Sequence, residues 1–212
     1  RRNPDGSVYY DVVFMPDCGK EFSPVSEWKI IYYGLDGGKL VFGGQTLWNN
    51  VEMLAIFGVQ KWGSPARLVG KPEFNYMHIS DDTDFITAPY DVCNRIEYSG
   101  EKYEQYIYQP FTPIFGAKVH VIAQWDNVPS GRTIDPTPWP GIISREAGFT
   151  WAGYAFPGQA VLFNMHFAQS AMDPDNPKGT EGWITLVRRA IDYREPTFGP
   201  ITLYVWRGQE VS

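Results

Sequence analysis

The sequence has little of what marks secreted or membrane-spanning proteins. Its two cysteines, Cys18 and Cys93, lie far apart and show no CxxC spacing, which favours two free thiols in a reducing compartment over one disulfide. No window approaches the ~18 consecutive apolar residues of a membrane-spanning helix. No Asn-x-Ser/Thr sequon occurs, which weighs against a glycosylated secreted protein. We therefore expect a globular chain without a membrane partner.

Excess positive charge and catalytic motifs are also missing. The 18 Lys and Arg residues are outnumbered by 24 Asp and Glu residues, so no domain-wide positive field for nucleic acid exists. No GxSxG elbow, HExxH, CxxC pair or Walker lysine motif occurs. The stretch "GLDGGKL" has Leu40 where a phosphate loop needs Ser or Thr for magnesium, and it fits a hairpin turn. We predict no enzyme, no catalytic or metal residues and no cofactor.

The side chains that could still carry chemistry are scattered along the chain. A metal site needs two or three histidines or carboxylates that converge, which the sequence does not show. Two acidic loops could offer oxygen ligands to calcium, but neither matches an EF-hand loop, and four arginines near two tryptophans could contact phosphates or form interface ion pairs. These candidates are His78, His120 and His166; Asp81, Asp82 and Asp84; Asp173, Asp175, Asn176 and Glu181; and Arg188, Arg189, Arg194 and Arg207 with Trp183 and Trp206.

Aromatic residues and turn formers are abundant. Aromatics make up 16% of the chain, beside 21 Gly and 17 Pro, a composition that favours short strands and many loops. Apolar residues alternate in 117–125, 160–168, 183–191 and 200–208, which predicts strands. Residues 46–62 show the clearest helical spacing in the chain and predict a helix with Thr46 as its N-cap. We expect strand, turn, strand over 26–44 and a surface loop over 126–148.

The stretch "FTWAGYAFPGQAVLFNMHF" carries no charge. We interpret it as two consecutive strands, 149–156 and 160–168, with Pro157 at the corner because proline cannot donate to a strand ladder. Val161, Phe163, Met165 and Phe167 would then face the core. Because no composition break suggests a linker, we expect one domain, and 212 residues is routine for one all-β sandwich.

The order of these segments resembles the coat proteins of picorna-like plant viruses, most of all the small coat protein of comovirus-type (secovirid) viruses. That group has a strand with an "NGK"-like turn, a helix ending in Trp, a Pro-Gly before an alternating apolar strand, and a "TWYLE"-like strand before the last one. The corresponding segments here are Gly37-Gly38-Lys39, Lys61 to Ser64, Pro157-Gly158 with Ala160 to Phe167, and Trp183 to Leu186. Residues 66–115 are longer and more aromatic than the family pattern.

The resemblance implies an all-β fold, an antiparallel eight-stranded jelly-roll β-sandwich with one or two short helices. It implies a single domain over 1–212, with 1–24 as an N-terminal extension. The protein would assemble with sister coat proteins into an icosahedral shell around single-stranded RNA, which it would contact weakly at most. Its location would be the virion, assembled in the host cytoplasm.

Two other functions remain open from the residues themselves. The 8 Trp and 13 Tyr residues, with "TPWPG" and "WDN" in loops, would suit a carbohydrate-binding β-sandwich of the lectin or tail-fibre type. A sandwich-fold enzyme is the other hypothesis, suggested by the loop carboxylates together with His120 or His166.

Overall fold

The structure is a computed structural model of the 212-residue chain. It describes residues 11–16, 20–61, 66–68, 76–97, 105–107, 111–114, 116, 118–125, 140–165 and 177–192.

A mixed sheet of seven strands forms the centre of the described residues. Its strand order is β1-β2-β13-β10-β9-β5-β6. β1, β2 and β13 pair in parallel, whereas β10, β9, β5 and β6 join through antiparallel pairs. The strands are β1 (Val12–Met15), β2 (Lys39–Gly43), β5 (Tyr76–Ile79), β6 (Arg95–Glu97), β9 (Val119–Trp125), β10 (Pro140–Arg145) and β13 (Ala160–Phe163).

Helix α1 (Pro24–Leu35) makes the crossover between the parallel strands β1 and β2, a connection that parallel pairing requires. Ser23 caps the helix, because its side-chain oxygen accepts a hydrogen bond from the Ser26 N–H, and Pro24 occupies the first turn, where a missing N–H costs nothing. The helix gives way to β2 through Gly37, whose φ of +93° few other residues adopt.

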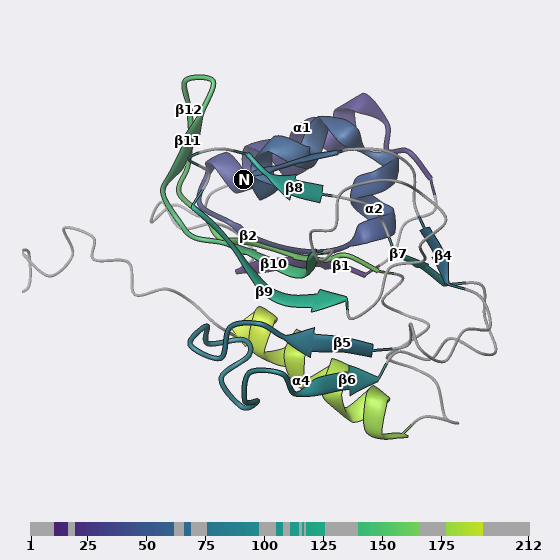
Figure 1. Ribbon diagram of the computed structural model, residues 1–212. Coiled ribbons are helices and arrows are strands. Elements are labelled where there is room, and N and C mark those ends of the chain that lie inside the picture. Colours follow the sequence, from purple (N-terminus) through teal and green to yellow (C-terminus); the bar gives the residue numbers. More distant parts are fainter. Residues whose placement is uncertain are drawn as a thin grey trace, which may run out of the picture.

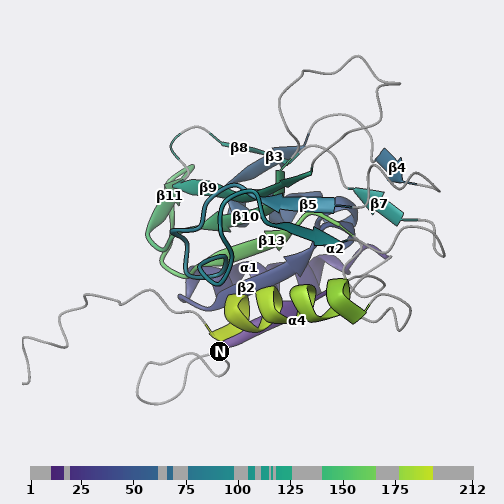
Figure 2. The same cartoon turned by 60° about the horizontal axis from the view of Figure 1, so that its bottom comes forward.

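Helices cover both faces of the sheet, as Figures 1 and 2 show. Helices α1 and α2 (Gly44–Asn49) and the 3₁₀ helix η1 (Val51–Phe57) lie on one face, and α4 (Pro177–Asp192) lies on the other. β2 illustrates the result, because Leu40 and Phe42 pack toward α1 and η1 while Val41 packs in the cluster of α4. A strand buried on both faces needs an apolar run, and β13 ("AVLF") is buried throughout.

The remaining strands form small pairs. β3 (Val59–Lys61) pairs with β8 (Phe111–Pro113), β4 (Ala66–Leu68) with β7 (Gln105–Ile107), and β11 (Phe149–Trp151) with β12 (Tyr154–Phe156). Ala152 and Gly153 both have positive φ, at 48° and 82°, the geometry of a tight hairpin turn.

The corner between β12 and β13 contains Pro157 and Gly158. A Cβ atom on Gly158 would lie 2.2 Å from the backbone oxygen of Gly38. Glycine is therefore needed where this corner passes the turn that leads into β2. Among the described residues, no helix is long and apolar enough to cross a membrane.

The predicted jelly roll is wrong, because the described residues form a mixed α/β fold with parallel strands and helices on both faces. The first strand expected in 26–44 is helix α1, and residues 183–191 belong to helix α4. In α4, Trp183, Leu186, Val187 and Ala190 are buried, at the spacing of a helical face, whereas Ile184 and Arg188 are exposed. The apolar residues that predicted an alternating strand at 183–191 are therefore spaced along one face of a helix.

Other segments agree only in part. The predicted surface loop 126–148 contains β10, whose residues 140–145 are mostly buried, and 149–156 is a hairpin instead of one strand. The predicted helix 46–62 is divided into α2, η1 and, at its end, strand β3. The N-cap of α2 is Gly43, whereas the sequence predicted Thr46 as the cap. The strand predicted at 117–125 is confirmed over Val119–Trp125, and the one predicted at 160–168 is confirmed over Ala160–Phe163. The strand at 200–208 lies outside the described residues.

Candidate functional site

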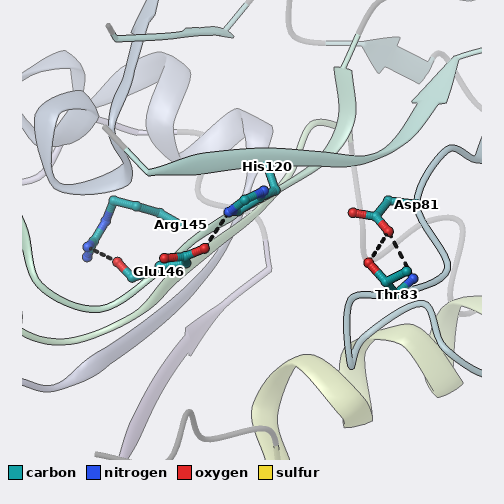
Figure 3. A network of polar contacts seen from close by, with 5 residues as sticks. All are labelled: Asp81, Thr83, His120, Arg145 and Glu146. Atoms are coloured by element: carbon teal, nitrogen blue, oxygen red, sulfur yellow. Dashed lines mark hydrogen bonds and ion pairs between the residues drawn. The ribbon is translucent and has the colours of Figure 1, made fainter. Parts of the chain in front are cut away.

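Three of the predicted candidates meet at one end of the sheet, where β5 and β10 end and β9 begins. His120 lies on β9 directly opposite Ser144 of β10, and Asp81 and Asp84 follow β5 in the chain. The His120 Nε2 atom lies 2.6 Å from Glu146 Oε1, and both side chains are about half exposed, at 48% and 43%. Figure 3 shows this pair beside the Asp81 loop. The sequence could not show that these residues converge.

The two aspartates of this network have opposite environments. Hydrogen bonds from the Thr83 hydroxyl (2.6 Å) and N–H (2.9 Å) hold the pKa of Asp81 below its usual value. Burial raises the pKa of Asp84, although the Ile86 N–H (2.8 Å) and the Ser144 hydroxyl stabilise its charged form. Perturbed carboxyl groups of this kind occur at reaction sites but also in structural networks.

The hydrogen bonds favour the structural explanation. Asp81 and Asp84 each accept a bond from the backbone N–H two residues later, the pattern of an Asx turn. The Thr87 hydroxyl donates to the Asp81 carbonyl, and the Asp84–Ser144 bond attaches the loop to β10. Within the described part of the chain, no group of three His, Cys, Asp or Glu residues could hold a metal ion.

Arg145, next to Glu146, is a buried residue that the sequence analysis placed in a surface loop. Its side chain is 1% exposed and donates to the carbonyls of Ile56 (2.6 Å), Glu146 (2.7 Å) and Gly158 (2.7 Å). Its guanidinium lies over the rings of Phe149 and Phe156, 5.7 and 6.0 Å from their centroids. Because it ties η1 to the hairpin and the sheet, Arg145 is a structural residue.

The other predicted candidates do not join this network. Arg189 of α4 donates to the Phe85 carbonyl (2.7 Å) and covers the Phe85 ring. Trp183 is buried, with its indole N–H donating to the Glu97 carbonyl. His78 lies on β5, Asp82 is exposed in the loop, Glu181 and Arg188 are exposed on α4, and Cys93 is a free, exposed thiol. Cys18, His166, Asp173, Asp175, Asn176, Arg194, Trp206 and Arg207 lie outside the described residues.

Helix α1 has an exposed apolar face that the sequence analysis missed. Val25, Trp28 and Tyr32, which we name the α1 face, are 64%, 54% and 60% exposed. Their spacing of three and four residues places them on one side of the helix, and the Trp28 and Tyr32 rings lie 5.7 Å apart. The opposite side of the helix, with Tyr33 and Gly34, is buried against the core. Figure 1 shows α1 in the outer layer of the molecule.

Three acidic side chains, Glu21, Glu27 and Glu52, lie near one another beside α1 and η1, and we name them the acidic rim. Glu27 precedes Trp28, and Glu52 lies on the neighbouring η1. Burial raises the pKa of Glu27, and the charge of Glu52, a hydrogen bond shared with it, and the charge of Glu21 raise it further. Carboxylates that disfavour each other's ionisation form a local negative potential.

Comparison with known proteins gives a likeness of fold. No protein-family model matches the chain, and no curated protein matches its sequence. A ThuA-like protein from Bacteroides uniformis is similar in structure, with a TM-score of 0.54 and 13% identity over 91% of this chain and 74% of that one. At 13% identity, this similarity supports a mixed α/β fold.

Two further solved structures are similar at lower scores. A cytoplasmic protein of Salmonella typhimurium, STM3548, has a TM-score of 0.47 and 15% identity over 84% of this chain and 71% of that one. A β-galactosidase from Halorubrum lacusprofundi has a TM-score of 0.46 and 12% identity over 88% of this chain and 23% of the galactosidase.

The resemblance to a picorna-like coat protein is therefore wrong, as is the capsid function drawn from it. It matched an order of turns and apolar runs, and an α/β sandwich has similar runs because its central strands are buried on both faces. The carbohydrate-binding β-sandwich fails for the same reason, because the sheet is mixed and helix-covered. The coat-protein partners, weak RNA contact and virion location stay predictions, without the fold on which they rested.

Proposed function

We propose that this chain is a non-enzymatic protein-interaction domain whose α1 face binds a basic, amphipathic helical segment of a partner protein. The observation that carries the proposal is the exposure of Trp28 and Tyr32, each more than half accessible, on one side of a single helix. Trp and Tyr are the residues most enriched at the energetic centres of protein interfaces. An apolar face that follows a helix suits a partner with apolar residues at the same spacing.

The acidic rim supports a basic partner. Burial raises the pKa of Glu27, and the charge of Glu52 raises it further; a Lys or Arg side chain placed at Glu27 and Glu52 would relieve that repulsion. The chain's formal net charge of −6 would favour encounter with the same kind of partner. A neutral or acidic partner would leave the two carboxylates crowded, and a second copy of this chain would bring two acidic rims close together.

The sheet-edge network supports the absence of catalysis. The hydrogen bonds of Asp81 and Asp84 stabilise a turn and its attachment to β10. His120 and Glu146 form a half-exposed pair with each other. These bonds account for the charged groups of the network without a substrate.

The test uses a defined probe. A fluorescent helical peptide of about 14 residues, with Leu every third or fourth position and Lys or Arg between, is titrated with the chain. The comparison peptide carries Glu at every basic position. We expect the basic peptide to bind, and Trp28→Ser with Tyr32→Ser to weaken its binding about tenfold or more. The matched control, Ile184→Ser, removes an exposed apolar residue of α4 and should bind like the wild type.

Three results would refute the proposal: no binding of the basic peptide, equal binding of the acidic peptide, or unchanged affinity in the double variant. Self-association of the wild-type chain at the concentrations used, abolished by the double variant, would show that the face serves a second copy instead. Circular dichroism of each variant verifies folding, which we expect to persist because Trp28, Tyr32 and Ile184 are all exposed.

A further inference from the structure

Strand β1 forms one edge of the seven-stranded sheet. Among the described residues, β1 pairs only with β2, in parallel, and β6 forms the opposite edge. The four residues of β1 are all apolar; three of them are partly buried and Phe14 is exposed. Proteins protect an edge strand with charges, with proline or with a covering segment. Since β1 itself contains neither charge nor proline, a covering segment is the protection that suits it.

The path of the chain indicates where a further strand lies. α1 connects β1 to β2 on one face of the sheet, a step toward β13, and α4 follows β13 on the other face. Crossovers between parallel strands are almost always right-handed. Two crossovers of the same hand on opposite faces move in opposite directions, so a parallel strand that follows α4 lies on the β1 side of β13. Because β2 and β1 hold the first two positions there, the next position is the outer edge of β1.

Helix α4 ends close to this edge. Ile191, in the last turn of α4, and Val12, the first residue of β1, pack against the same apolar cluster. Figures 1 and 2 both show the end of α4 near the start of β1. The seven residues 193–199 can span about 23 Å when extended, several times the spacing of about 4.8 Å between neighbouring strands. They therefore suffice to bring the chain from α4 to the outer edge of β1.

Residues 200–208 have the composition of a covering strand. This segment lies outside the described residues, and its sequence, "PITLYVWRG", has Ile201, Leu203 and Val205 in alternation and Arg207 as its one charge. β-branched and aromatic residues favour strands. An apolar segment with one charge near its end suits an edge strand that has none.

We propose that residues 200–208 dock on the outer edge of β1 as a parallel strand and cover this edge against pairing with a second copy of the chain. The segment would bind β1 through a backbone ladder like the one that β2 forms on the other side, and its alternating apolar side chains would extend the clusters on the two faces of the sheet. The docking uses no residue of the α1 face, so it stands or falls independently of the proposed function.

Disulfide trapping in the full chain tests the proposal. In a background with Cys18→Ser and Cys93→Ser, Phe14→Cys is combined in turn with a substitution to cysteine at each of positions 201–206, and the chains are oxidised in dilute solution. We expect an intramolecular disulfide at one or two neighbouring positions, because cysteines bridge only where their Cα atoms lie within about 7 Å. The matched control, Arg95→Cys on the opposite edge strand β6, should form no disulfide with the same series.

Hydrogen exchange gives a second measurement. Leu203→Asp places a charge in the middle of the segment and should accelerate amide exchange of residues 12–15 about tenfold or more, whereas Gln209→Asp, beyond the segment, should leave the exchange unchanged. The proposal is overturned if Phe14→Cys bridges to none of the six positions, if the Arg95→Cys series bridges instead, or if Leu203→Asp does not alter the exchange of β1. A bridged product that is a covalent dimer would also overturn it, because the edge would then bind the segment of a second copy.

Discussion

At the scale of single residues, the fold relies on buried polar groups that the composition does not reveal. Arg145 is almost fully buried and donates to four carbonyls, those of Ile56 in η1, Phe156 in β12, and Glu146 and Gly158 in the connections beside the sheet. A charge in such a place is stabilising only while its hydrogen bonds are made, because each unsatisfied buried group costs about 1–3 kcal/mol. The residue therefore holds η1, the β11–β12 hairpin and the sheet together.

Replacing Arg145 should destabilise the whole fold. Arg145→Met fills similar space but leaves the carbonyls of Ile56 and Gly158 without these donors. We expect a loss of roughly 3 kcal/mol or more in the free energy of unfolding, measured by urea denaturation. Arg188→Met changes an exposed arginine and should stay within about 0.5 kcal/mol of the wild type. Equal stability of the two variants would show that Arg145 is not structural.

The aspartates of the network should influence stability in opposite directions as pH changes. The lowered pKa of Asp81 gives stability that is present above its unfolded pKa of about 4 and lost as pH falls through the folded value. The raised pKa of Asp84 gives stability that is present below about pH 4 and lost as pH rises through the folded value.

Urea denaturation of two variants between pH 3 and pH 7 checks this. Asp81→Asn should be less stable than the wild type at pH 7, and the difference should shrink toward pH 3. Asp84→Asn, whose amide oxygen can still accept from the Ile86 N–H, should gain stability relative to the wild type as pH rises. Parallel curves for both variants would contradict the two environments.

At the scale of elements, the sequence predicted strands where apolar residues alternate or form a short run, and it failed where the spacing of a helix resembles that of a strand. The sequence predicted β9, in which apolar and polar residues alternate, and β13, whose four consecutive apolar residues are typical of a buried strand. α4 was predicted as a strand because Trp183, Thr185 and Val187 also alternate. α1 was missed because "WKIIYY" has β-forming residues, whereas Ser23, Pro24 and the crossover between parallel strands determine a helix.

A pair of substitutions separates helix from strand in α4. In a strand, residues 184 and 186 would share one face and respond alike. In the helix, Leu186 is fully buried and Ile184 is 46% exposed. Leu186→Ala should therefore cost about 2–5 kcal/mol, and Ile184→Ala should cost about 0.5 kcal/mol or less. Thermal unfolding of both variants measures the difference, and equal costs would contradict the helix.

At the scale of the whole molecule, the two helical layers leave different surfaces for function. The α4 side carries a groove of about 380 Å³ between β6 and the first half of α4, and the α1 side carries an exposed apolar face. The sequence could not predict either surface, because both depend on which side of a helix the core covers. The candidates it did identify, His120, Asp81 and Asp84, converge only in the folded chain; the two aspartates stabilise a turn, and His120 pairs with Glu146.

The most direct measurement exchanges the charge of the acidic rim. Glu27→Lys with Glu52→Lys leaves Trp28 and Tyr32 in place and replaces Glu27, whose pKa is raised by burial and by the charge of Glu52, together with Glu52 itself. If the α1 face binds a basic amphipathic segment, the wild type prefers the basic peptide, and the exchanged variant prefers the acidic one. If both proteins show the same preference, or neither peptide binds, the α1 face is not the interaction site we propose.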